Sequence, residues 1–409
     1  MERIWAKTAL TPAGWRDDVL VVVDADGRIE AVGAGAPAEG RRVDVLLPAP
    51  ANLHSHAFQR AMAGMTERRA PSGEDGFWTW RRLMYRFLDR LTPDDVAAIA
   101  AMVQVEMLEA GYAAVGEFHY LHHRPDGTPY DDPAEMSAAV AGAAAETGIG
   151  LTLLPVLYQV GGCDGRPLGP GQIRFGAGPD RFAKLTEGAR RHLGALPADA
   201  ALGVAPHSLR AVTPEGLAAA VEIAGDGPIH IHVAEQIAEV EEALAHRGAR
   251  PAEWLLANAP VGPHWCLIHL TQMERTETEA VAASGAVAGL CPITEANLGD
   301  GIFDGVAFLA AGGRFGVGSD SNLRVALGEE LRTLDYSQRL RDGTRAALAE
   351  PGGSTGRRLF EGAAHGGAQA LRRPAGAIAP AMLADLVALD AGALPLCGLT
   401  GDALLDGWI

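Results

Sequence analysis

Strand-like runs that alternate with helix-like segments are the feature that most constrains the fold of this chain. Eight short apolar runs read as buried strands, and they cover residues 45–54, 113–119, 149–157, 201–207, 228–233, 265–270, 286–291 and 314–319. Segments with helical periodicity lie between them, at 94–110, 133–147, 180–196, 214–224, 237–246 and 274–283. Eight such units predict an α/β fold, a (β/α)8 TIM barrel, whose functional residues follow the carboxyl ends of its strands.

The two ends of the chain read differently from this alternation. Residues 19–23 and 29–32 flank the turn-forming segment 24–27, which predicts a hairpin, and residues 384–390 supply another strand. We therefore expect a small β-sandwich domain built from both termini. The predicted division is residues 1–48 for the N-terminal part of the sandwich, 49–370 for the barrel and 371–409 for the C-terminal part.

Composition excludes several classes of partner and site. The 409-residue chain carries a formal net charge of -17, which argues against nucleic acid or anionic membranes as partners. It has neither a signal-peptide core at its start nor a run of about 18 uncharged apolar residues, so we expect a cytoplasmic protein. The four cysteines lack CxxC spacing, so the sequence suggests neither a disulfide framework nor a thiolate zinc site.

Polar residues with metal and proton chemistry follow the predicted strands. His54 and His56 close the first run, and alternation along a strand points both imidazoles to the same face. The other strand-end residues are His119, Tyr120, His207, Arg210, His230, His232, Glu235, His269 and Asp320. Because the carboxyl ends of barrel strands meet at one mouth, we expect these side chains to gather there.

Four of these residues form the predicted metal site. His54, His56, His232 and Asp320 offer three nitrogens and one oxygen, a donor set that suits zinc and leaves a position for water. The alternative for His232 alone is a core histidine bonded to a backbone carbonyl. Asp320 follows an apolar strand and is also a candidate proton acceptor.

Glu235 and His269 are the candidates for moving protons. Glu235 lies three residues after His232, where it can overhang the metal without binding it. Its alternative role is a surface carboxylate at the start of the next helix. His269 can hydrogen-bond a water beside the metal, or make a structural hydrogen bond to a neighbouring strand.

These residues carry a resemblance to a known family. The HxH pair with later His, His and Asp strand ends resembles the amidohydrolase superfamily in its single-metal deaminase branch. Within it, five stretches resemble the N-formimino-L-glutamate deiminases: residues 52–64, 77–81, 117–120, 207–214 and 294–301. The similarity runs along nearly the whole chain, although relatives continue beyond Ile409, so the C-terminal part is expected to be truncated.

The resemblance implies a fold, an activity and a set of roles. It implies a barrel with a β-sandwich, and hydrolysis of a formimino group to formyl with loss of ammonia, a step of histidine degradation. One Zn2+ per subunit, with Fe2+ or Mn2+ as alternatives, is implied at His54, His56, His232 and Asp320. Proton transfer is implied for Glu235, His269 and Asp320. Substrate contacts are implied for Gln59, Arg81, Tyr120, His207 and Arg210. A homodimer is also expected.

The arginines favour one substrate class and leave alternatives open. A small anionic substrate derived from an amino acid needs guanidinium groups in the pocket of so acidic a protein. Arg81 and Arg82 point about 100° apart on a helix, so only one is expected to enter the site. Deaminases of the guanine, cytosine or S-adenosylhomocysteine type share the ligand set and remain alternatives, as does a non-catalytic barrel scaffold. The Gly-rich loop 161–178 is long enough to cover the site.

Overall fold

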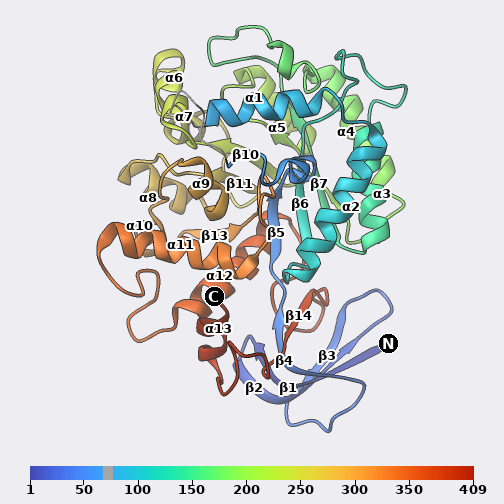
Figure 1. Ribbon diagram of the computed structural model, residues 1–409, viewed down its shortest axis with the longest axis vertical. Helices are drawn as coiled ribbons and strands as arrows, with labels where there is room; N and C mark the ends of the chain where they lie inside the picture. Colours follow the sequence, from blue (N-terminus) through green and yellow to red (C-terminus); the bar gives the residue numbers. More distant parts are fainter. Residues whose placement is uncertain (68–76) are drawn as a thin grey trace.

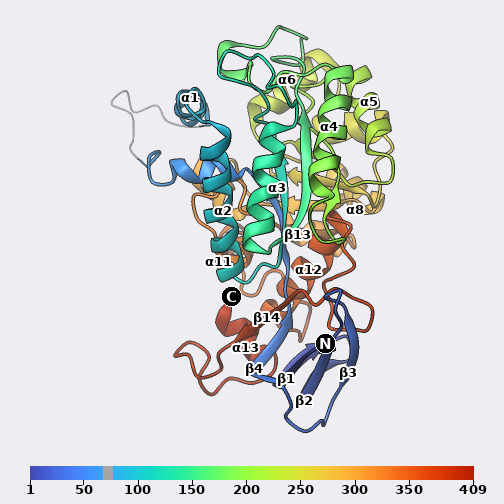
Figure 2. The same ribbon diagram turned by 90° about the vertical axis from the view of Figure 1, so that its right-hand side faces the viewer.

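The computed structural model describes residues 1–67 and 77–409, and for residues 77–79 the backbone alone. Figure 1 shows a barrel above a smaller β domain, and both chain ends lie toward that domain. Figure 2, turned by 90°, shows helices packed along the outside of the barrel. The predicted barrel with a β domain built from both termini is confirmed.

The β domain is a five-stranded sheet with the order β14-β4-β1-β2-β3. Its strands are β1 (Glu2–Thr11), β2 (Gly14–Val23), β3 (Ile29–Gly33), β4 (Arg41–Pro48) and β14 (Leu386–Leu389). The predicted hairpin is the antiparallel pair β2 and β3, and the predicted C-terminal strand is β14, which pairs antiparallel with β4. Val19, Val21, Ile29 and Ile378 form part of the domain's own buried core.

The barrel consists of parallel strands in eight positions. They are β5 (Ala51–Ser55), β6 (Ala114–His119), β7 (Gly150–Leu157), β8 (Ala201–Leu202) with β9 (Ala205–Pro206), β10 (Ile229–Val233), β11 (Trp265–His269), β12 (Val287–Leu290) and β13 (Arg314–Val317). Continuous ladders join β5 to β8 and β9, and β10 to β13. Single bridges, Val204 to Ile229 and Ser55 to Asp320, join these two halves into a ring.

The seam between the first and last barrel strands is tight. The Asp320 N–H donates to the His54 carbonyl and the His56 N–H donates to the Asp320 carbonyl, each at 2.9 Å. A Cβ at Gly318 would lie 2.7 Å from the backbone N of His54, so only glycine permits this approach. The seam thereby places Asp320 next to the HxH pair.

Helices cover the outside of the ring. They are α1 (Phe77–Leu88), α2 (Pro93–Glu109), α3 (Glu135–Thr147), α4 (Pro179–Leu193), α5 (Pro214–Ala224), α6 (Ile237–Arg247), α7 (Pro251–Asn258), α8 (Arg275–Ser284), α9 (Pro292–Leu298), α10 (Gly305–Ala310), α11 (Leu327–Asp342), α12 (Thr355–Ala370) and α13 (Asp402–Trp408), with 3-10 turns η1 (Ala57–Met62) and η2 (Pro170–Gln172). The six predicted helices are confirmed to within a few residues. Their starts follow local chemistry, since Thr92 and Asp95 form a capping box at α2 with Pro93 in the first turn.

Two predicted strands are divided in the structure. The run 45–54 spans β4 of the β domain and β5 of the barrel, because Pro48 and Pro50 interrupt backbone donation between the two sheets. The run 201–207 is divided into β8 and β9 around Gly203. A Cβ at Gly203 would lie 2.4 Å from the Pro228 carbonyl oxygen, so the chain bends at a point of close backbone approach.

The amino-terminal end of the barrel is filled by apolar side chains and closed by an ion-pair cluster. Leu371, at the end of α12, packs in a buried apolar cluster with residues of β5, β6, β11 and β12. Arg373 is 2% exposed in its side chain and contacts Asp199 at 2.8 Å and Asp385 at 3.2 Å. His230 Nε2 donates to the Ala370 carbonyl. This end therefore ties the barrel to the segment that leads into β14.

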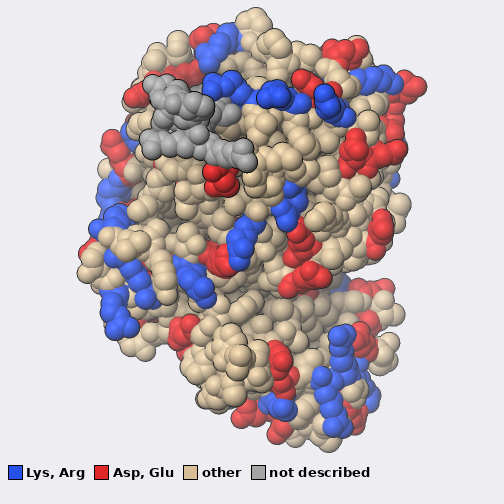
Figure 3. Space-filling view, viewed as in Figure 1, with Lys and Arg blue, Asp and Glu red and all other residues tan. Residues whose placement is uncertain are grey.

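Acidic and basic side chains are interspersed on the face shown in Figure 3. Of the helices within residues 1–67 and 77–409, none combines the length and apolar character required to cross a membrane.

Candidate active site

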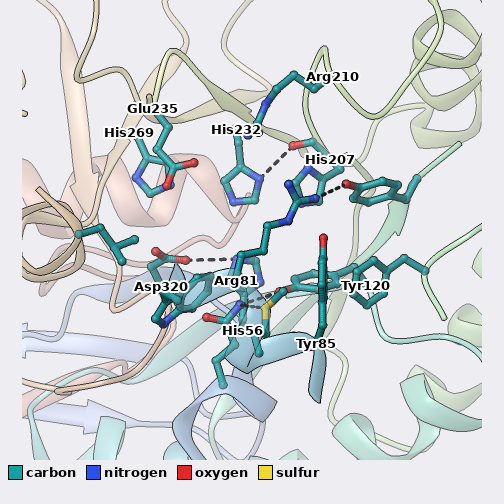
Figure 4. Close-up of a pocket in the computed structure, with 16 residues that line it drawn as sticks. His56, Arg81, Tyr85, Tyr120, His207, Arg210, His232, Glu235, His269 and Asp320 are labelled. Carbon is teal, nitrogen blue, oxygen red and sulfur yellow. Dashed lines mark hydrogen bonds and ion pairs between the residues drawn. The ribbon is translucent and has the colours of Figure 1, made fainter. Parts of the chain in front are cut away.

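The four predicted ligands meet at the carboxyl end of the barrel. His54 and His56 come from β5 and the residue after it, His232 from β10, and Asp320 from the segment after β13. One donor atom from each residue lies within 4.8 Å of the others, and all four residues are buried. Figure 4 shows His56, His232 and Asp320 facing one another across the pocket floor. The four residues, here called the His3Asp cluster, are grouped as a metal site would require.

Distances within the His3Asp cluster show that its donor atoms converge. Asp320 Oδ1 lies 3.3 Å from His54 Nε2 and 3.2 Å from His56 Nε2. His54 Nε2 and His232 Nε2 lie 3.1 Å apart. Two imidazole nitrogens that both present lone pairs repel each other unless a proton or cation lies between them.

Backbone carbonyls orient two of the rings. His56 Nδ1 donates to the Phe118 carbonyl at 2.9 Å, and His232 Nδ1 donates to the His207 carbonyl at 3.0 Å. Each bond fixes the proton on Nδ1 and directs the Nε2 lone pair toward the centre of the cluster. A hydrogen bond to a backbone carbonyl is also what the alternative interpretation of His232, as a core histidine, required. In the structure His232 makes this bond and also belongs to the His3Asp cluster.

Burial and hydrogen bonding keep His54, His232 and Asp320 in the protonation states that bind metal. Burial lowers the pKa of His54 to about 3 and holds the pKa of His232 well below its usual value. Burial opposes ionisation of Asp320, but hydrogen bonds from His54 and His56 hold its pKa below the ordinary range. Neutral imidazoles with a carboxylate are the ligand forms for a divalent cation, so the residues fit a single metal ion.

His269 and Glu235 lie beside the cluster, as Figure 4 shows. His269 Nε2 is 3.9 Å from a Glu235 oxygen, and His269 Nδ1 donates to Glu295 at 3.3 Å. Burial acts against protonation of His269, but Glu235 and then Glu295 raise its pKa to about 10. Both predicted proton carriers therefore line the pocket, and His269 is held between two carboxylates.

Several residues of this region have strained backbone, among them three at the ends of barrel strands. His269, Asp320 and Ala234 have φ values of 75°, 45° and 53°, in the left-handed region that residues with a Cβ seldom adopt. Such strain costs roughly 1–3 kcal/mol at each position and persists where the surrounding structure enforces it. The pocket mouth therefore carries strain that places side chains.

The pocket contains all five predicted substrate-binding residues. Its lining is His56, Gln59, Trp80, Arg81, Met84, Tyr85, Tyr120, Tyr158, Phe175, His207, Arg210, His232, Glu235, His269, Leu298 and Asp320. Arg81 enters the pocket, whereas Arg82 is exposed, as helical spacing predicts. Two guanidinium groups thus share a buried pocket with the His3Asp cluster.

Neighbouring side chains hold several of these groups. Gln59 Nε2 donates to the Tyr120 hydroxyl at 2.6 Å, and His207 Nδ1 lies 3.1 Å from the Ser208 hydroxyl. Arg210 Nε is buried and has no hydrogen-bond partner among the described residues. A buried guanidinium donor without a partner fits a site for an anionic group.

Other predicted strand-end histidines lie outside the His3Asp cluster. His119 is buried beside His122, with ring centroids 5.4 Å apart, and His230 lies in the filled amino-terminal half of the barrel. Burial lowers the pKa of His119 and of His230 to about 4. Both behave as neutral core histidines.

Several pocket residues were not identified from the sequence. They are Trp80, Met84, Tyr85, Tyr158, Phe175 and Leu298, together with Glu295 behind His269. Most are apolar or aromatic residues that pattern analysis assigns to the core. Trp80, Glu295 and Leu298 fall inside motifs that carry the family resemblance, which was the available signal. The side chains of Phe77–Thr79 in one of those motifs lie outside the described residues.

Comparison with known proteins agrees with this geometry. The Amidohydrolase family matches residues 45–404, and the N-terminal domain of formimidoylglutamate deiminase HutF matches residues 1–42. A formimidoylglutamate deiminase from Pseudomonas aeruginosa is 48% identical over 100% of this chain and 90% of its own length. An 8-oxoguanine deaminase from the same species is 30% identical over 94% of this chain and 85% of its own length.

A solved structure extends the similarity to the whole fold. An amidohydrolase from Brucella melitensis superposes with a TM-score of 0.96 and 50% sequence identity, covering 100% of this chain and 91% of that protein. The barrel, the β domain and the full-length sequence match therefore agree. The chain belongs to the amidohydrolase family.

Proposed function

We propose that the protein is a hydrolytic deiminase that converts N-formimino-L-glutamate and water to N-formyl-L-glutamate and ammonia, a step of histidine degradation. The observation that carries the proposal is the pocket in which Arg81 and Arg210 lie with the His3Asp cluster. The substrate has an amidine carbon to be hydrolysed and two carboxylates to be bound. The formimidoylglutamate deiminase that is 48% identical to this chain supports the same reaction.

The metal proposed for the cluster is zinc, one ion per subunit. His54, His56, His232 and Asp320 would hold it, and their three nitrogens and one oxygen match the donors that zinc prefers. Iron or manganese is accommodated by the same donors. When bound, such an ion supplies Lewis acidity that lowers the pKa of a water molecule.

Glu235, His269 and Asp320 would move the protons. Asp320 and His269 are the proposed acceptors of a proton from the attacking water, since both line the pocket beside the cluster. For His269 this role requires that a cation bound at the cluster lower the pKa of the ring, which neighbouring carboxylates raise to about 10. Glu235 is placed to deliver a proton to the imino nitrogen as the amidine carbon becomes tetrahedral. Asp320 then returns a proton to that nitrogen, which departs as ammonia. As the formyl carbonyl forms, the proton of the attacking hydroxyl passes to Glu235, which restores its starting state.

The remaining pocket groups would orient the substrate. Arg81 and Arg210 bind carboxylates by charge-assisted hydrogen bonds. Gln59, Tyr120 and His207 offer further donors within the same lining. A neutral purine or pyrimidine brings no anionic partner for the buried Nε of Arg210, so the pocket disfavours nucleobase deamination despite the related 8-oxoguanine deaminase.

Three further proposals concern the whole chain. The boundaries 1–48, 49–370 and 371–409 are supported by the end of β4 at Pro48 and of α12 at Ala370. We also propose a homodimer in the cytoplasm. The retained donor set argues against a barrel that serves only as a scaffold.

Ammonia release from a substrate panel tests the function. Purified protein loaded with zinc is assayed with N-formimino-L-glutamate, N-formimino-L-aspartate, guanine, cytosine and S-adenosylhomocysteine. We expect kcat/KM for N-formimino-L-glutamate to exceed that for each nucleobase or nucleoside by at least ~10³. A preference for a nucleobase or nucleoside, or no ammonia from any of the five, contradicts the proposal. Metal analysis of the same sample reports the zinc content per chain.

A further inference from the structure

Tyr158 lines the pocket but has no role in the function proposed above. It follows β7 directly, lines the pocket and is 4% exposed. Its hydroxyl accepts a hydrogen bond from Arg81 Nη2 at 3.1 Å and another from Gln172 Nε2 at 2.7 Å. The bond to Arg81 is the dashed line at the guanidinium in Figure 4. Tyr158 therefore joins a proposed substrate-binding arginine to the loop 161–178.

The ring of Tyr158 is fixed by its neighbours. It contacts His207 with ring centroids 4.6 Å apart, and Phe175 with centroids 5.6 Å apart. The Tyr158 carbonyl accepts from the Ala177 N–H at 2.9 Å, so its backbone is also bound to the loop. Because ring and backbone are both held, the hydroxyl has a defined place beside Arg81.

The loop that carries Gln172 is itself packed against the helix that carries Arg81. Gln172 Oε1 accepts from the Gly169 N–H at 2.8 Å, which leaves its amide nitrogen directed at Tyr158. A Cβ at Gly171 would lie 2.2 Å from the Tyr85 ring, so η2 lies directly on α1. The contacts connect loop, ring and arginine into one unit.

The hydrogen bonds that the Tyr158 hydroxyl already accepts indicate that its own hydrogen remains available as a donor. A phenol oxygen has two acceptor positions and one hydrogen to donate. Arg81 and Gln172 both donate to this oxygen, so they use its acceptor positions. The remaining hydrogen is a donor at the pocket wall, next to a cationic group. A carboxylate, which accepts hydrogen bonds only, is the complementary partner.

We propose that Tyr158 donates a hydrogen bond to one carboxylate of the substrate, and that Gln172 is a positioning residue that directs this hydroxyl. The loop 161–178 thereby contributes to substrate affinity through Gln172. This inference rests on the proposed function, since it requires a substrate with a carboxylate at Arg81. It adds a specificity-determining donor to the two arginines.

The first test removes the hydroxyl alone. Tyr158→Phe keeps the ring against His207 and is expected to raise KM for N-formimino-L-glutamate by ~10- to 100-fold, the range for a lost hydrogen bond to a charged group. We expect kcat to change less than threefold, and the Kd of N-formyl-L-glutamate from calorimetry to rise in parallel with KM. Unchanged KM and Kd would overturn the proposal.

Tyr112→Phe is the matched control. Its hydroxyl is also buried, has no hydrogen-bond partner among the described residues, and lies outside the pocket lining. We expect KM within twofold of the wild-type value. An equal KM increase in both variants would assign the effect to general loss of a buried hydroxyl and would refute the specific role of Tyr158.

Two substrate analogues identify the carboxylate. N-formimino-L-glutamine lacks the side-chain carboxylate, and 4-formimidoylaminobutyrate lacks the α-carboxylate. With one of them, the KM ratio between Tyr158→Phe and wild type is expected to fall to within twofold of one, because the group that Tyr158 contacts is already absent. A ratio that stays as large with both analogues as with the parent substrate would overturn the contact.

Gln172→Leu tests the positioning role. The single variant is expected to raise KM by ~3- to 10-fold, as the hydroxyl loses one of the bonds that direct it. Added to Tyr158→Phe, it should have no further effect, because Gln172 acts through the hydroxyl. Independent, multiplying effects would refute that role. Ammonia release by the wild-type enzyme separates the two proposals: its absence overturns both, and its presence with an unchanged Tyr158→Phe overturns this one alone.

Discussion

The two ends of the barrel differ in the kinds of residues that are buried there. At the carboxyl end, His54, His56, His232 and Asp320 are buried together, and Asp320 has a strained backbone. At the amino end, buried apolar residues fill the space between the strands, and Arg373 closes it with two acidic partners. The carboxyl end concentrates titratable groups whose charged forms are destabilised by burial. The amino end contains packed apolar side chains and a buried arginine that is paired with acidic residues.

This difference separates activity from stability. Buried polar groups and strained residues lower stability and are retained where they serve a site, whereas apolar packing and paired ions hold the fold. Substitutions at the carboxyl end should therefore change catalysis with little loss of stability. Substitutions at the amino end should do the reverse, and the following experiments test this separation.

Asp320→Ala should have the largest effect on catalysis. It removes the oxygen donor of the His3Asp cluster and a proposed proton carrier together, so we expect kcat/KM to fall by at least ~10³. Metal analysis should show reduced zinc per chain. The melting temperature of the metal-free variant should stay close to that of the metal-free wild type, and a large decrease would break the separation of the two ends.

Glu235→Gln should reduce turnover without loss of metal. The side chain lines the pocket but lies outside the His3Asp cluster, so zinc content should be unchanged. We expect kcat to fall by ~10²- to 10⁴-fold, the range for loss of a general acid. Normal turnover at full metal content would show that Glu235 carries no proton in this reaction.

Arg373→Met tests the opposite end. The substitution leaves Asp385 in a buried place without its cation, where burial already raises the pKa of its carboxyl. We expect the free energy of unfolding in urea to fall by ~3–5 kcal/mol, with kcat within twofold.

The control for Arg373 is Arg3→Met in the exposed pair with Glu39, whose side chains are 52% and 47% exposed. We expect a change below ~1 kcal/mol, because solvent screens such pairs. Equal losses in the two variants would mean that the buried ion pair contributes no more than a surface pair.

Glu295→Gln should reduce catalysis less than Asp320→Ala or Glu235→Gln does. The amide oxygen still accepts from His269 Nδ1, but the charge that faces the ring is removed. We expect kcat to fall by ~10-fold with KM unchanged, as for other partners of active-site histidines. Glu330→Gln is the control, since that carboxylate is also buried and accepts from the Ile293 N–H without contacting His269. A similar loss in both variants would indicate a structural effect.

The parts of the fold that local pattern determines were predictable from the sequence. Strand and helix periods give the barrel, and polar residues at strand ends give the cluster, because parallel strands bring their carboxyl ends together. The run 45–54 was predicted as one strand, but the structure divides it between β4 and β5. Its residues are buried in two different sheets. The apolar pattern predicts that a residue is buried, but it does not indicate to which sheet the residue belongs.

Site residues whose role depends on contacts with distant parts of the chain were not predictable from the sequence. Tyr158 continues an apolar strand and reads as core, yet its hydroxyl is bonded by Arg81 and Gln172 from distant parts of the chain. Glu295 lies in a recognisable motif, but its role depends on His269 in another strand. Such pairings are set by tertiary contact, which no local spacing encodes.

The seam at Asp320 has a consequence for synthesis of the protein. The carboxylate lies beyond the last barrel strand, while its histidine neighbours His54 and His56 lie at the first. A nascent chain on the ribosome therefore carries most of the catalytic groups long before it can use them. Activity is expected only after the final strand docks beside the first, so a translation product that ends before Asp320 is expected to be inactive.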